Sequence, residues 1–253
     1  MRLALFDLDH TLLSADSDVQ WCEFLIGEGR LDAPFAEQYR LVASHYDAGT
    51  VSPIDYCHFH AATLAGYSVE ELRPLRERFF RDWIRPHIPV DARELLRRCR
   101  ARDETLVLTT ATNRVVSELT AQDLGVDHYL CTELELADGR YTGRTCGTLN
   151  MRSGKVERVR QWLQETNQPE ALLHEASFYT DSINDLALLS AVRKPIVVDP
   201  DSRLEATALR KGWTVLRLHR PLFKPTPEAP RIDLRAAVPE APRAVERRAR
   251  ERE

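Results

Sequence analysis

The sequence has no apolar run that approaches the ~20 residues needed to span a bilayer. Met1-Arg2 leads straight into an apolar segment, without the stretches that make up a signal peptide. The five cysteines, at positions 22, 57, 99, 131 and 146, have no paired short spacing, so neither a disulfide framework nor a zinc site is indicated. We therefore expect a soluble cytoplasmic protein whose thiols are reduced.

The sequence also lacks a large excess of positive or negative residues. The chain has 35 Lys and Arg against 39 Asp and Glu, a formal net charge of −4, which gives no reason to expect nucleic acid as a partner. A membrane is not expected either, and the sequence does not indicate an oligomeric state. With 253 residues, 43% of them hydrophobic, the chain is long enough to bury a full core and a second small domain.

Three short apolar runs read as strands, and each delivers a polar side chain at its end. Residues 2–6 precede Asp7, residues 104–108 precede Thr109, and residues 176–180 precede Asp181. In an open parallel sheet, ligands bind outside the carboxyl ends of the strands. We therefore expect these side chains to meet at one site, despite their separation along the chain.

These residue types suit the transfer of a phosphoryl group. A phosphate dianion repels carboxylates, so a divalent cation must lie among them, and Asp7 and Asp181 can supply the hard oxygen ligands that Mg²⁺ prefers. Asp7 can then attack phosphorus and carry an aspartyl-phosphate intermediate. Asp9 points the same way two residues further along an extended chain, so it can protonate the leaving alcohol and later deprotonate the attacking water.

Further polar residues complete this candidate site. The Thr109 hydroxyl and the Lys155 ammonium are suited to the phosphoryl oxygens. Asp185, which ends the run Asp181-Ser182-Ile183-Asn184-Asp185, can hold a metal-bound water or Lys155.

Each piece taken alone has a simpler explanation. Asp-Xaa-Asp at a strand end often forms only a solvated turn. A threonine at a strand end commonly precedes a helix, which Asn113 would cap here, and residues 181–185 could equally cap the helix that follows them. The occurrence of all the pieces in one chain favours the phosphoryl-transfer site.

The motif Phe6-Asp7-Leu8-Asp9-His10-Thr11, with Thr109, Lys155 and residues 181–185, resembles the motif set of the haloacid dehalogenase superfamily, and within it the phosphoserine phosphatase-like branch of subfamily IB. The resemblance extends over residues 1–218. It implies that Asp7 is the nucleophile and a magnesium ligand. It also implies that Asp9 is the acid/base and lends its backbone carbonyl to the metal.

The same resemblance implies roles for the other motif residues. Thr109 would bind the phosphoryl group with Thr110 beside the substrate, and Lys155 would neutralise the phosphoryl charge. Asp181 resembles the second metal carboxylate and Asp185 its acidic companion at the metal. Asn184 resembles the active-site Asn that precedes that companion in this branch.

Two positions depart from the commonest pattern of the branch. Thr180 stands where Gly often precedes the metal Asp, and Thr109-Thr110-Ala111-Thr112 replaces a Ser-Gly-Gly run. Glycine allows a close backbone approach to a ligand, which Thr-Ala-Thr does not. The second departure therefore argues against phosphoserine as the substrate, but not against phosphatase chemistry.

The order of predicted elements gives the expected architecture. Helical periodicity without a convincing strand runs through residues 16–86, where the resembling branch carries its cap, and strand–helix alternation resumes after it. We expect an α/β fold, with a doubly wound, Rossmann-like parallel sheet core in residues 1–15 and 87–220. An inserted α-helical cap domain would occupy residues 16–86, and residues 221–253 would form a flexible tail.

Two local patterns make sharper predictions. Ser68 and Glu71 have the form of a capping box, but Pro74 is expected to restart that helix. Residues 134–145 are expected to form a hairpin, separate from a preceding strand at 128–132, with Asp138-Gly139 at its turn.

The residues that select a substrate are less clearly marked. Asp16 and Asp18 follow the first motif and are candidates to bind a substrate ammonium group, as an acidic residue near this position does in the resembling phosphatases. Equally, they could cap the helix through Trp21. His58 and His60 lie on the expected cap and could face the site. However, Cys57-His58-Phe59-His60 has no sound metal geometry, and both histidines are expected to be structural.

We expect a Mg²⁺-dependent phosphatase that hydrolyses a small-metabolite phosphomonoester through an aspartyl phosphate, with phosphoserine and histidinol phosphate as candidate substrates. A phosphotransferase or mutase would share every motif. A receiver-like signalling module, itself phosphorylated on Asp, is disfavoured, because Thr109 stands where its internal acidic strand end would be.

Overall fold

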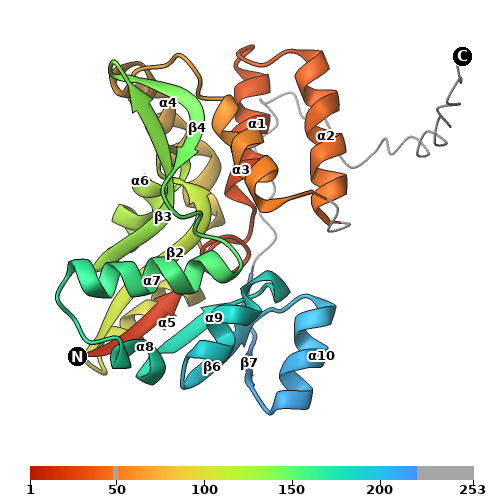
Figure 1. Ribbon diagram of the computed structural model, residues 1–253. Coiled ribbons are helices and arrows are strands. Elements are labelled where there is room, and N and C mark those ends of the chain that lie inside the picture. Colours follow the sequence, from red (N-terminus) through yellow and green to blue (C-terminus); the bar gives the residue numbers. More distant parts are fainter. Residues whose placement is uncertain (48–50, 221–253) are drawn as a thin grey trace, which may run out of the picture.

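The computed structural model describes residues 1–47 and 51–220, and the tail expected at 221–253 lies outside the described residues (Figure 1). Its centre is a seven-stranded sheet in the order β4-β3-β2-β1-β5-β6-β7. All neighbouring strands are parallel except the β3–β4 pair. The strands are β1 (Arg2–Phe6), β2 (Glu104–Asn113), β3 (His128–Ala137), β4 (Arg140–Cys146), β5 (Ser177–Thr180), β6 (Lys194–Val198) and β7 (Thr214–Leu216).

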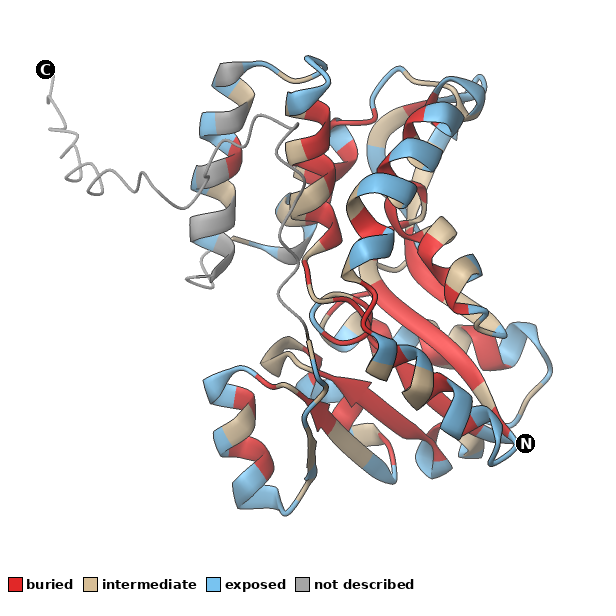
Figure 2. Ribbon diagram, turned by 180° about the vertical axis from the view of Figure 1, so that it is seen from behind, coloured by how far each residue is buried: buried red, intermediate tan, exposed pale blue. Residues whose placement is uncertain are grey.

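Helices cover both faces of this sheet (Figures 1 and 2). Helix α5 (Val90–Arg100) precedes β2, and α6 (Arg114–Leu124) follows it. The helices after β4 are α7 (Ser153–Glu165), α8 (Ala171–Glu175), α9 (Leu186–Ala191) and α10 (Ser202–Lys211). A 3-10 turn, η3 (Ile183–Asp185), leads into α9. The short helix α8 was not predicted, because its sequence has no strong helical pattern.

The alternation of side chains along β1 explains the two layers. Ala4 and Phe6 pack into a core cluster with residues of α5 and α6, whereas Leu3 and Leu5 pack with residues of α7 to α10. Successive side chains of a strand point to opposite faces, so a fully apolar strand must be covered on both. The doubly wound α/β fold expected from the sequence is confirmed.

β1 lies between β2 and β5, which places it where the strand order reverses. The chain leaves β1 toward β2 on one side and later returns to β5 on the other. Connections diverge at such a switch point and leave a crevice at the carboxyl ends of the strands, the usual ligand site of open α/β sheets.

Within the described residues, no helix is long and apolar enough to cross a membrane.

The segment between β1 and β2 is helical. It contains α1 (Ser17–Gly27), α2 (Ala33–Asp47), α3 (Pro53–Ala62), α4 (Val69–Phe79), a π-helical turn η1 (Phe80–Ile84) and a 3-10 turn η2 (Arg85–His87). Figure 1 shows α1, α2 and α3 standing side by side beyond the carboxyl ends of the central strands.

The capping box at the start of α4 is present, with Ser68 and Glu71 bonded reciprocally. The expected restart at Pro74 is wrong, because α4 runs through this residue without a break. The buried side chains of Leu72, Leu75 and Phe79 hold the helix against the core on both sides of the proline. This packing outweighs the hydrogen bond that proline removes, since tertiary contacts supply most helical stability in proteins.

The hairpin is present, but it is not separate from the strand before it. β3 is one continuous strand whose first half pairs with β2 and whose second half pairs with β4. The turn at Asp138-Gly139 has positive φ at both residues, as a two-residue hairpin turn requires. The hairpin extends beyond the sheet to the residues that follow α3, where the Gly66 amide donates to the Tyr141 carbonyl and the Tyr141 amide donates to the Tyr67 carbonyl. These bonds attach the hairpin to the helical segment.

Candidate active site

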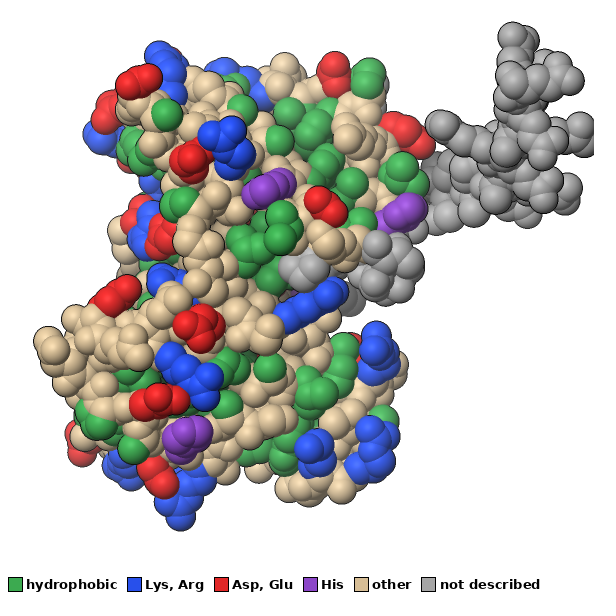
Figure 3. All heavy atoms as spheres, in the orientation of Figure 1, with side chains coloured by type: hydrophobic (Ala, Val, Ile, Leu, Met, Phe, Trp, Pro, Cys, Tyr) green, Lys and Arg blue, Asp and Glu red, His purple; other side chains and the backbone are tan. Residues whose placement is uncertain are grey.

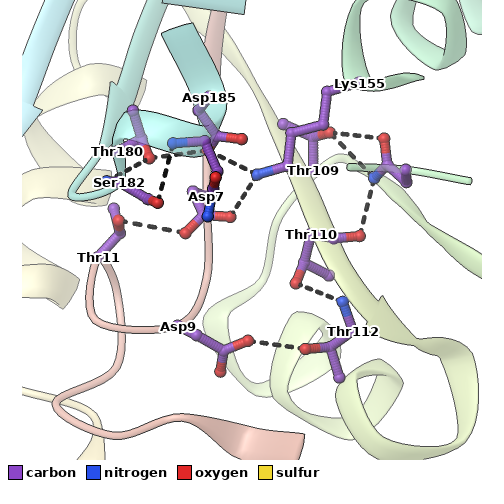
Figure 4. Close-up of polar contacts among 12 residues, drawn as sticks. Asp7, Asp9, Thr11, Thr109, Thr110, Thr112, Lys155, Thr180, Ser182 and Asp185 are labelled. Carbon is purple, nitrogen blue, oxygen red and sulfur yellow. Dashed lines mark hydrogen bonds and ion pairs between the residues drawn. The ribbon is translucent and has the colours of Figure 1, made fainter. Parts of the chain in front are cut away.

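The polar residues that end the predicted strands do meet. Asp7 follows β1, Asp181 follows β5, and Thr109 lies in β2, all at the carboxyl edge of the sheet (Figure 4). The Asp7 amide donates to the Tyr179 carbonyl at 2.9 Å, so the β1–β5 pairing fixes its position. β2 continues to Asn113, so Thr109 and its neighbours belong to the strand rather than following its end.

Lys155 is the centre of the most strongly bonded part of the site. Its Nζ donates to Asp7 Oδ1 at 2.6 Å and to Asp185 Oδ2 at 2.7 Å, and the residue is only 3% exposed. Thr180 Oγ1 also donates to Asp185 Oδ2, at 2.8 Å. Burial acts to lower the pKa of Lys155, but the charges of Asp185 and Asp7 outweigh it and raise the pKa above its ordinary value. The two carboxylates therefore favour the charged ammonium form of Lys155.

A glycine shapes the start of α7, which carries Lys155. A Cβ at Gly154 would lie 2.0 Å from the Leu149 carbonyl oxygen, a distance that no side chain tolerates. Only glycine lets the preceding loop pass this closely, and this turn directs Lys155 toward the strand ends.

Thr11 joins the two carboxylates expected to bind the metal. Its Oγ1 donates to Asp181 Oδ1 at 3.0 Å, lies 3.4 Å from Asp7 Oδ2, and accepts from the Asp181 amide at 3.0 Å. Sequence reasoning quoted Thr11 within the first motif but gave it no role. The turn after Leu8, whose carbonyl accepts from the amides of Thr11 and Leu12, brings this hydroxyl back beside Asp7.

The carboxylates at this edge need a cation. Burial raises the pKa of Asp7 to about 7, with repulsion by Asp185 adding to the effect and Lys155 opposing it. Burial, followed by the charge of Asp7, also raises the pKa of Asp181 well above its ordinary value. A bound divalent cation would relieve both carboxylates, so Asp7 and Asp181 fit a magnesium ion, which typically takes one or two carboxylates and several waters.

The four residues expected at the metal are not gathered around one point. Asp185 is bonded to Lys155 and Thr180, and the Asp9 side chain is bonded elsewhere, so Asp9 is left with its backbone carbonyl for a metal. Within the described part of the chain, no group of three or more His, Cys, Asp or Glu side chains is arranged to hold a metal ion. Asp7 and Asp181 remain as a two-carboxylate pair.

Asp9 belongs to a second cluster, set apart from Lys155 in Figure 4. Its Oδ1 accepts from the Ser17 amide at 2.8 Å, and its Oδ2 accepts from Thr112 Oγ1 at 2.7 Å. Burial and the charge of Asp16 raise the pKa of Asp9, and the bonds from Ser17 and Thr112 partly oppose this. A carboxyl with a raised pKa that sits beside the nucleophile is suited to proton transfer.

Asn150 was missed by sequence reasoning, since a lone Asn in a loop carries no signal. It is fully buried, and its Nδ2 donates to the backbone carbonyls of Thr110 at 2.9 Å and Leu130 at 3.0 Å. Its amide also bonds Thr109 Oγ1, at 3.1 and 3.2 Å. The Thr109 hydroxyl is thereby fixed in orientation. The Thr110 hydroxyl accepts from the Thr112 amide at 3.1 Å.

Because of the turn η3, the side chains of the last motif, residues 181–185, have different partners. Ser182 Oγ accepts from the Asn184 amide at 3.2 Å, so the serine rather than Asp181 caps this turn. Asp181 is thereby left to face Thr11, Asp185 is directed inward to Lys155, and Asn184 lies half-buried between them in sequence.

The substrate candidates Asp16 and Asp18 have different surroundings. Asp16 caps α1, its Oδ1 accepting from the Val19 amide at 3.0 Å, which was the simpler of the two explanations. Asp18 is buried, and burial with the nearby charge of Asp9 raises its pKa to about 8. His58 contacts Thr145 Oγ1 at 3.1 Å, in keeping with a structural role, whereas His60 is buried on the inner side of α3.

Comparison with protein families and solved structures agrees with this geometry. The model of the haloacid dehalogenase-like hydrolase family matches residues 4–190. The chain belongs to this family. The match includes both strand-end Asp motifs, Lys155 and residues 181–185, so the family resemblance predicted from the sequence is confirmed.

Individual relatives carry phosphatase names. The chain is 40% identical to a histidinol-phosphatase of Neisseria meningitidis serogroup C, over 85% of this chain and 98% of that protein. It is 31% identical to the phosphoserine phosphatase SerB1 of Mycobacterium tuberculosis, over 84% of this chain and 69% of that protein. The expectation of a phosphomonoesterase of this family is confirmed at that level.

A solved structure of a protein of unknown function from Bordetella pertussis Tohama I is also similar. It is 42% identical to this chain, has a TM-score of 0.80, and covers 85% of this chain and 97% of its own.

Proposed function

We propose that the protein is a Mg²⁺-dependent phosphatase that hydrolyses a small-metabolite phosphomonoester through an aspartyl phosphate on Asp7. The observation that supports it most strongly is the division of the acidic residues into two clusters. One cluster binds Lys155 around Asp7, and the other holds Asp9 against Thr112 and Ser17. A nucleophile and a proton donor must be held separately in this way.

In the first step, an Asp7 carboxylate oxygen attacks phosphorus while the bond from phosphorus to the ester oxygen breaks. Asp9 gives its proton to the leaving alcohol. Lys155 Nζ and Thr109 Oγ1 donate to the phosphoryl oxygens, and Asn150 keeps the Thr109 hydroxyl oriented. In the second step, Asp9 takes a proton from water as the water oxygen attacks phosphorus, which releases inorganic phosphate and restores the Asp7 carboxylate.

Asp7 and Asp181 would hold the magnesium ion, and the Asp9 backbone carbonyl would add a third ligand. When bound, the ion would neutralise the repulsion between these carboxylates and the phosphate dianion. Thr11, whose hydroxyl contacts both Asp7 and Asp181, would hold these two carboxylates at a fixed distance from each other.

We propose that residues 16–86 form a cap domain over a core of residues 1–15 and 87–220. Figure 3 shows the molecule narrowing between the helical segment with the hairpin and the sheet, in keeping with two lobes. A cap at the carboxyl ends of the strands would exclude water from the phosphoryl group and select the leaving alcohol. The five cysteines are free thiols, as expected of a cytoplasmic protein, and we place the enzyme there.

Histidinol phosphate is the first substrate to test, because the relative named for it shares 40% of its residues and nearly its full length. Phosphoserine is the second, because of the 31% relative. A phosphotransferase or mutase would use the same residues, and the fate of the phosphoryl group distinguishes them.

The test measures inorganic phosphate released from histidinol phosphate, phosphoserine, phosphoethanolamine, sugar phosphates and nucleotides, with and without Mg²⁺. Selective release that requires Mg²⁺ is expected. Asp7→Asn is expected to abolish it with an unchanged circular dichroism spectrum, because an amide is a poor nucleophile. Asp138→Asn, at the exposed hairpin turn, is the matched control.

Full activity in folded Asp7→Asn would contradict the assignment of the nucleophile. Consumption of ester without free phosphate, when a second alcohol is present, would show a transferase instead of a hydrolase.

A further inference from the structure

Arg220, which follows β7, is bonded to the turn after β1. Its guanidinium Nη2 donates to the carbonyls of His10 at 2.6 Å and Thr11 at 2.9 Å, and Nη1 donates to the Leu13 carbonyl. In the sheet, β7 is separated from β1 by β5 and β6. The chain therefore returns from the edge of the sheet to the carboxyl end of its central strand, where one guanidinium binds three backbone carbonyls.

The turn after β1 depends on Arg220 for these bonds. It is tight, because the Leu8 carbonyl accepts from the amides of Thr11 at 3.2 Å and Leu13 at 2.9 Å, and His10 has a left-handed φ of 55°. Among the described residues, no other hydrogen bond reaches the carbonyls of Thr11 and Leu13. Both residues are fully buried, so a carbonyl left unbonded there would be unfavourable. Arg220 thus stabilises this conformation of the turn.

The same turn carries the hydroxyl that joins the two carboxylates expected to bind magnesium. Thr11 Oγ1 donates to Asp181 Oδ1 at 3.0 Å and lies 3.4 Å from Asp7 Oδ2. This hydroxyl is attached directly beside the Thr11 main chain, whose carbonyl accepts from Arg220. A displacement of the turn would therefore move the hydroxyl relative to both carboxylates.

The guanidinium is also bonded to the loop after β6. Its Nε donates to Asp199 Oδ2 at 2.7 Å, and the Arg220 and Asp199 side chains are only 19% and 23% exposed. Asp199 Oδ1 accepts from the Leu218 amide at 3.3 Å, and the Asp199 amide donates to the Leu216 carbonyl at 2.9 Å. Asp199 therefore fixes the direction from which Arg220 approaches, and it balances the charge of Arg220 in a partly buried place.

The loop after β6 also holds the backbone of the second carboxylate. The Asp201 amide donates to the Asp181 carbonyl at 3.0 Å, and Asp201 Oδ2 accepts from the Ile183 amide at 3.0 Å. Residues 199–201 are thus bonded to the segment that delivers Asp181 and, through Arg220, to the turn that delivers the Thr11 hydroxyl. Arg220 is therefore a direct link between the two segments.

An arginine side chain has the donors that this arrangement uses. A guanidinium presents its N–H groups in a rigid planar fork, and Nε and both Nη atoms of Arg220 are bonded here. A lysine ammonium would keep the charge, but its single nitrogen cannot reach Asp199 and three carbonyls in one geometry. The charge of the guanidinium also strengthens each bond that it donates to a neutral carbonyl.

We propose that Arg220 is a positioning residue that holds the Asp7 and Asp181 carboxylates in place for a magnesium ion, acting through the turn of residues 10–13 and the Thr11 hydroxyl. This proposal rests on the proposed phosphatase function. The bonds of Arg220 go to backbone carbonyls and to Asp199, so its contribution is to the placement of the metal ligands. Its loss is expected to weaken Mg²⁺ binding, with little change in KM for the ester at saturating Mg²⁺.

The first test measures Mg²⁺ binding to the full chain by isothermal titration calorimetry, without substrate. Arg220→Ala is expected to bind Mg²⁺ about tenfold to a hundredfold more weakly than the wild type, as is typical when a residue that orients metal ligands is removed. Arg220→Lys is expected to lose part of this affinity, because it keeps the charge but not the fork.

Arg217→Ala is the matched control. Arg217 lies in the same segment, but its exposed guanidinium pairs with the exposed carboxylate of Glu205. Surface ion pairs contribute little, so the Mg²⁺ affinity of this variant is expected to stay within about twofold of the wild type.

The route through Thr11 is tested by a double-mutant cycle. Thr11→Val keeps the shape of the side chain but removes the hydroxyl, and it is expected to weaken Mg²⁺ binding by itself. If Arg220 acts through this hydroxyl, the variant with both Thr11→Val and Arg220→Ala binds Mg²⁺ no more weakly than the weaker-binding single variant. Two losses that multiply would show that Arg220 acts independently of Thr11, and they would overturn the proposal.

These outcomes are separable from those of the phosphatase assay. If Arg220→Ala loses Mg²⁺ affinity as expected but the wild type releases phosphate from no ester, the positioning role stands and the proposed function is wrong. If the wild type hydrolyses an ester while Arg220→Ala, folded by circular dichroism, binds Mg²⁺ as tightly as the wild type, the positioning proposal is overturned. If Arg220→Ala does not fold, the same comparison is made with Arg220→Lys, for which an unchanged Mg²⁺ affinity is the contradicting result.

Discussion

Lys155 and Asp18 are both buried ionisable residues, but only Lys155 has partners of opposite charge. Lys155 is paired with two carboxylates, so its charge is balanced within the fold. Asp18 has an unbonded oxygen, and burial raises its pKa to about 8. A buried carboxyl group without a cationic partner is unfavourable to ionise, so the fold holds Asp18 in its protonated form up to a higher pH than the unfolded chain does.

This difference predicts a pH dependence of stability. In the unfolded chain Asp18 loses its proton near its ordinary pKa of 3.8, and in the folded protein only near 8. Below 3.8 both states are protonated, and between the two values only the unfolded chain is ionised, so Asp18 lowers the stability progressively as the pH rises through this window. The contribution is at most about 1.4 kcal/mol per pH unit.

Asp18→Asn removes this contribution. Its melting temperature is therefore expected to exceed that of the wild type, and the excess is expected to grow between about pH 5 and about pH 8. Thermal unfolding followed by circular dichroism at both pH values measures it, with Asp138→Asn as the control. A constant difference, or a variant that is less stable at the higher pH, would contradict the burial of an uncompensated carboxylate at position 18.

At the scale of elements, the hairpin β3–β4 connects the sheet to the helical segment. Its tight contact is at Gly143, where a Cβ would lie 2.9 Å from Ala65 Cβ and 3.3 Å from Ala62 Cα at the end of α3. Since α3 also carries His60, the hairpin sets the position of this buried histidine relative to the strand ends. The hairpin is therefore a structural support for the helical segment.

A pair of glycine variants tests this contact. Gly143→Ala and Gly147→Ala both introduce a side chain at positive φ, +80° and +68°, but only position 143 has neighbours within 4 Å. Both variants carry the backbone strain, and Gly143→Ala adds the clash with α3. It is expected to be less stable than Gly147→Ala by about 1–3 kcal/mol, a difference of about 2–4 °C in melting temperature per kcal/mol. Equal melting temperatures would show that the hairpin and α3 separate easily.

For the whole molecule, the features that could be predicted from the sequence are those that depend on short, local patterns of residues. Strand–helix alternation and the polar residues at strand ends were sufficient for the doubly wound sheet and for the meeting of Asp7, Thr109 and Asp181. The features that were missed depend on tertiary packing. Continuity of α4 through Pro74 depends on the buried stripe of the helix, and the role of Asn150 depends on backbone carbonyls of two strands that it bonds.

The substrate residues show the same limit. Asp16 and Asp18 both had the spacing of a cap and of a ligand site, and only the fold separates them, with Asp16 at the N-cap and Asp18 buried. His60 was expected to be structural, because Cys57-His58-Phe59-His60 has no sound metal geometry. The sequence of one helix does not show which residues lie opposite it. Its unbonded Nε2 appears only when α1 and α3 are packed together.

The central claim is that the phosphoryl group passes through Asp7. The most direct test is rapid acid quench of Asp9→Asn during reaction with histidinol phosphate, followed by mass spectrometry of the peptides. The variant lacks both the acid that assists the first step and the base that the second step requires, so a phosphoryl group is expected to form slowly and to persist on the peptide that contains Asp7. It should be lost on treatment with hydroxylamine, which cleaves acyl phosphates. A phosphoryl group on any other residue, or turnover without labelling of this peptide at any quench time, would contradict the account.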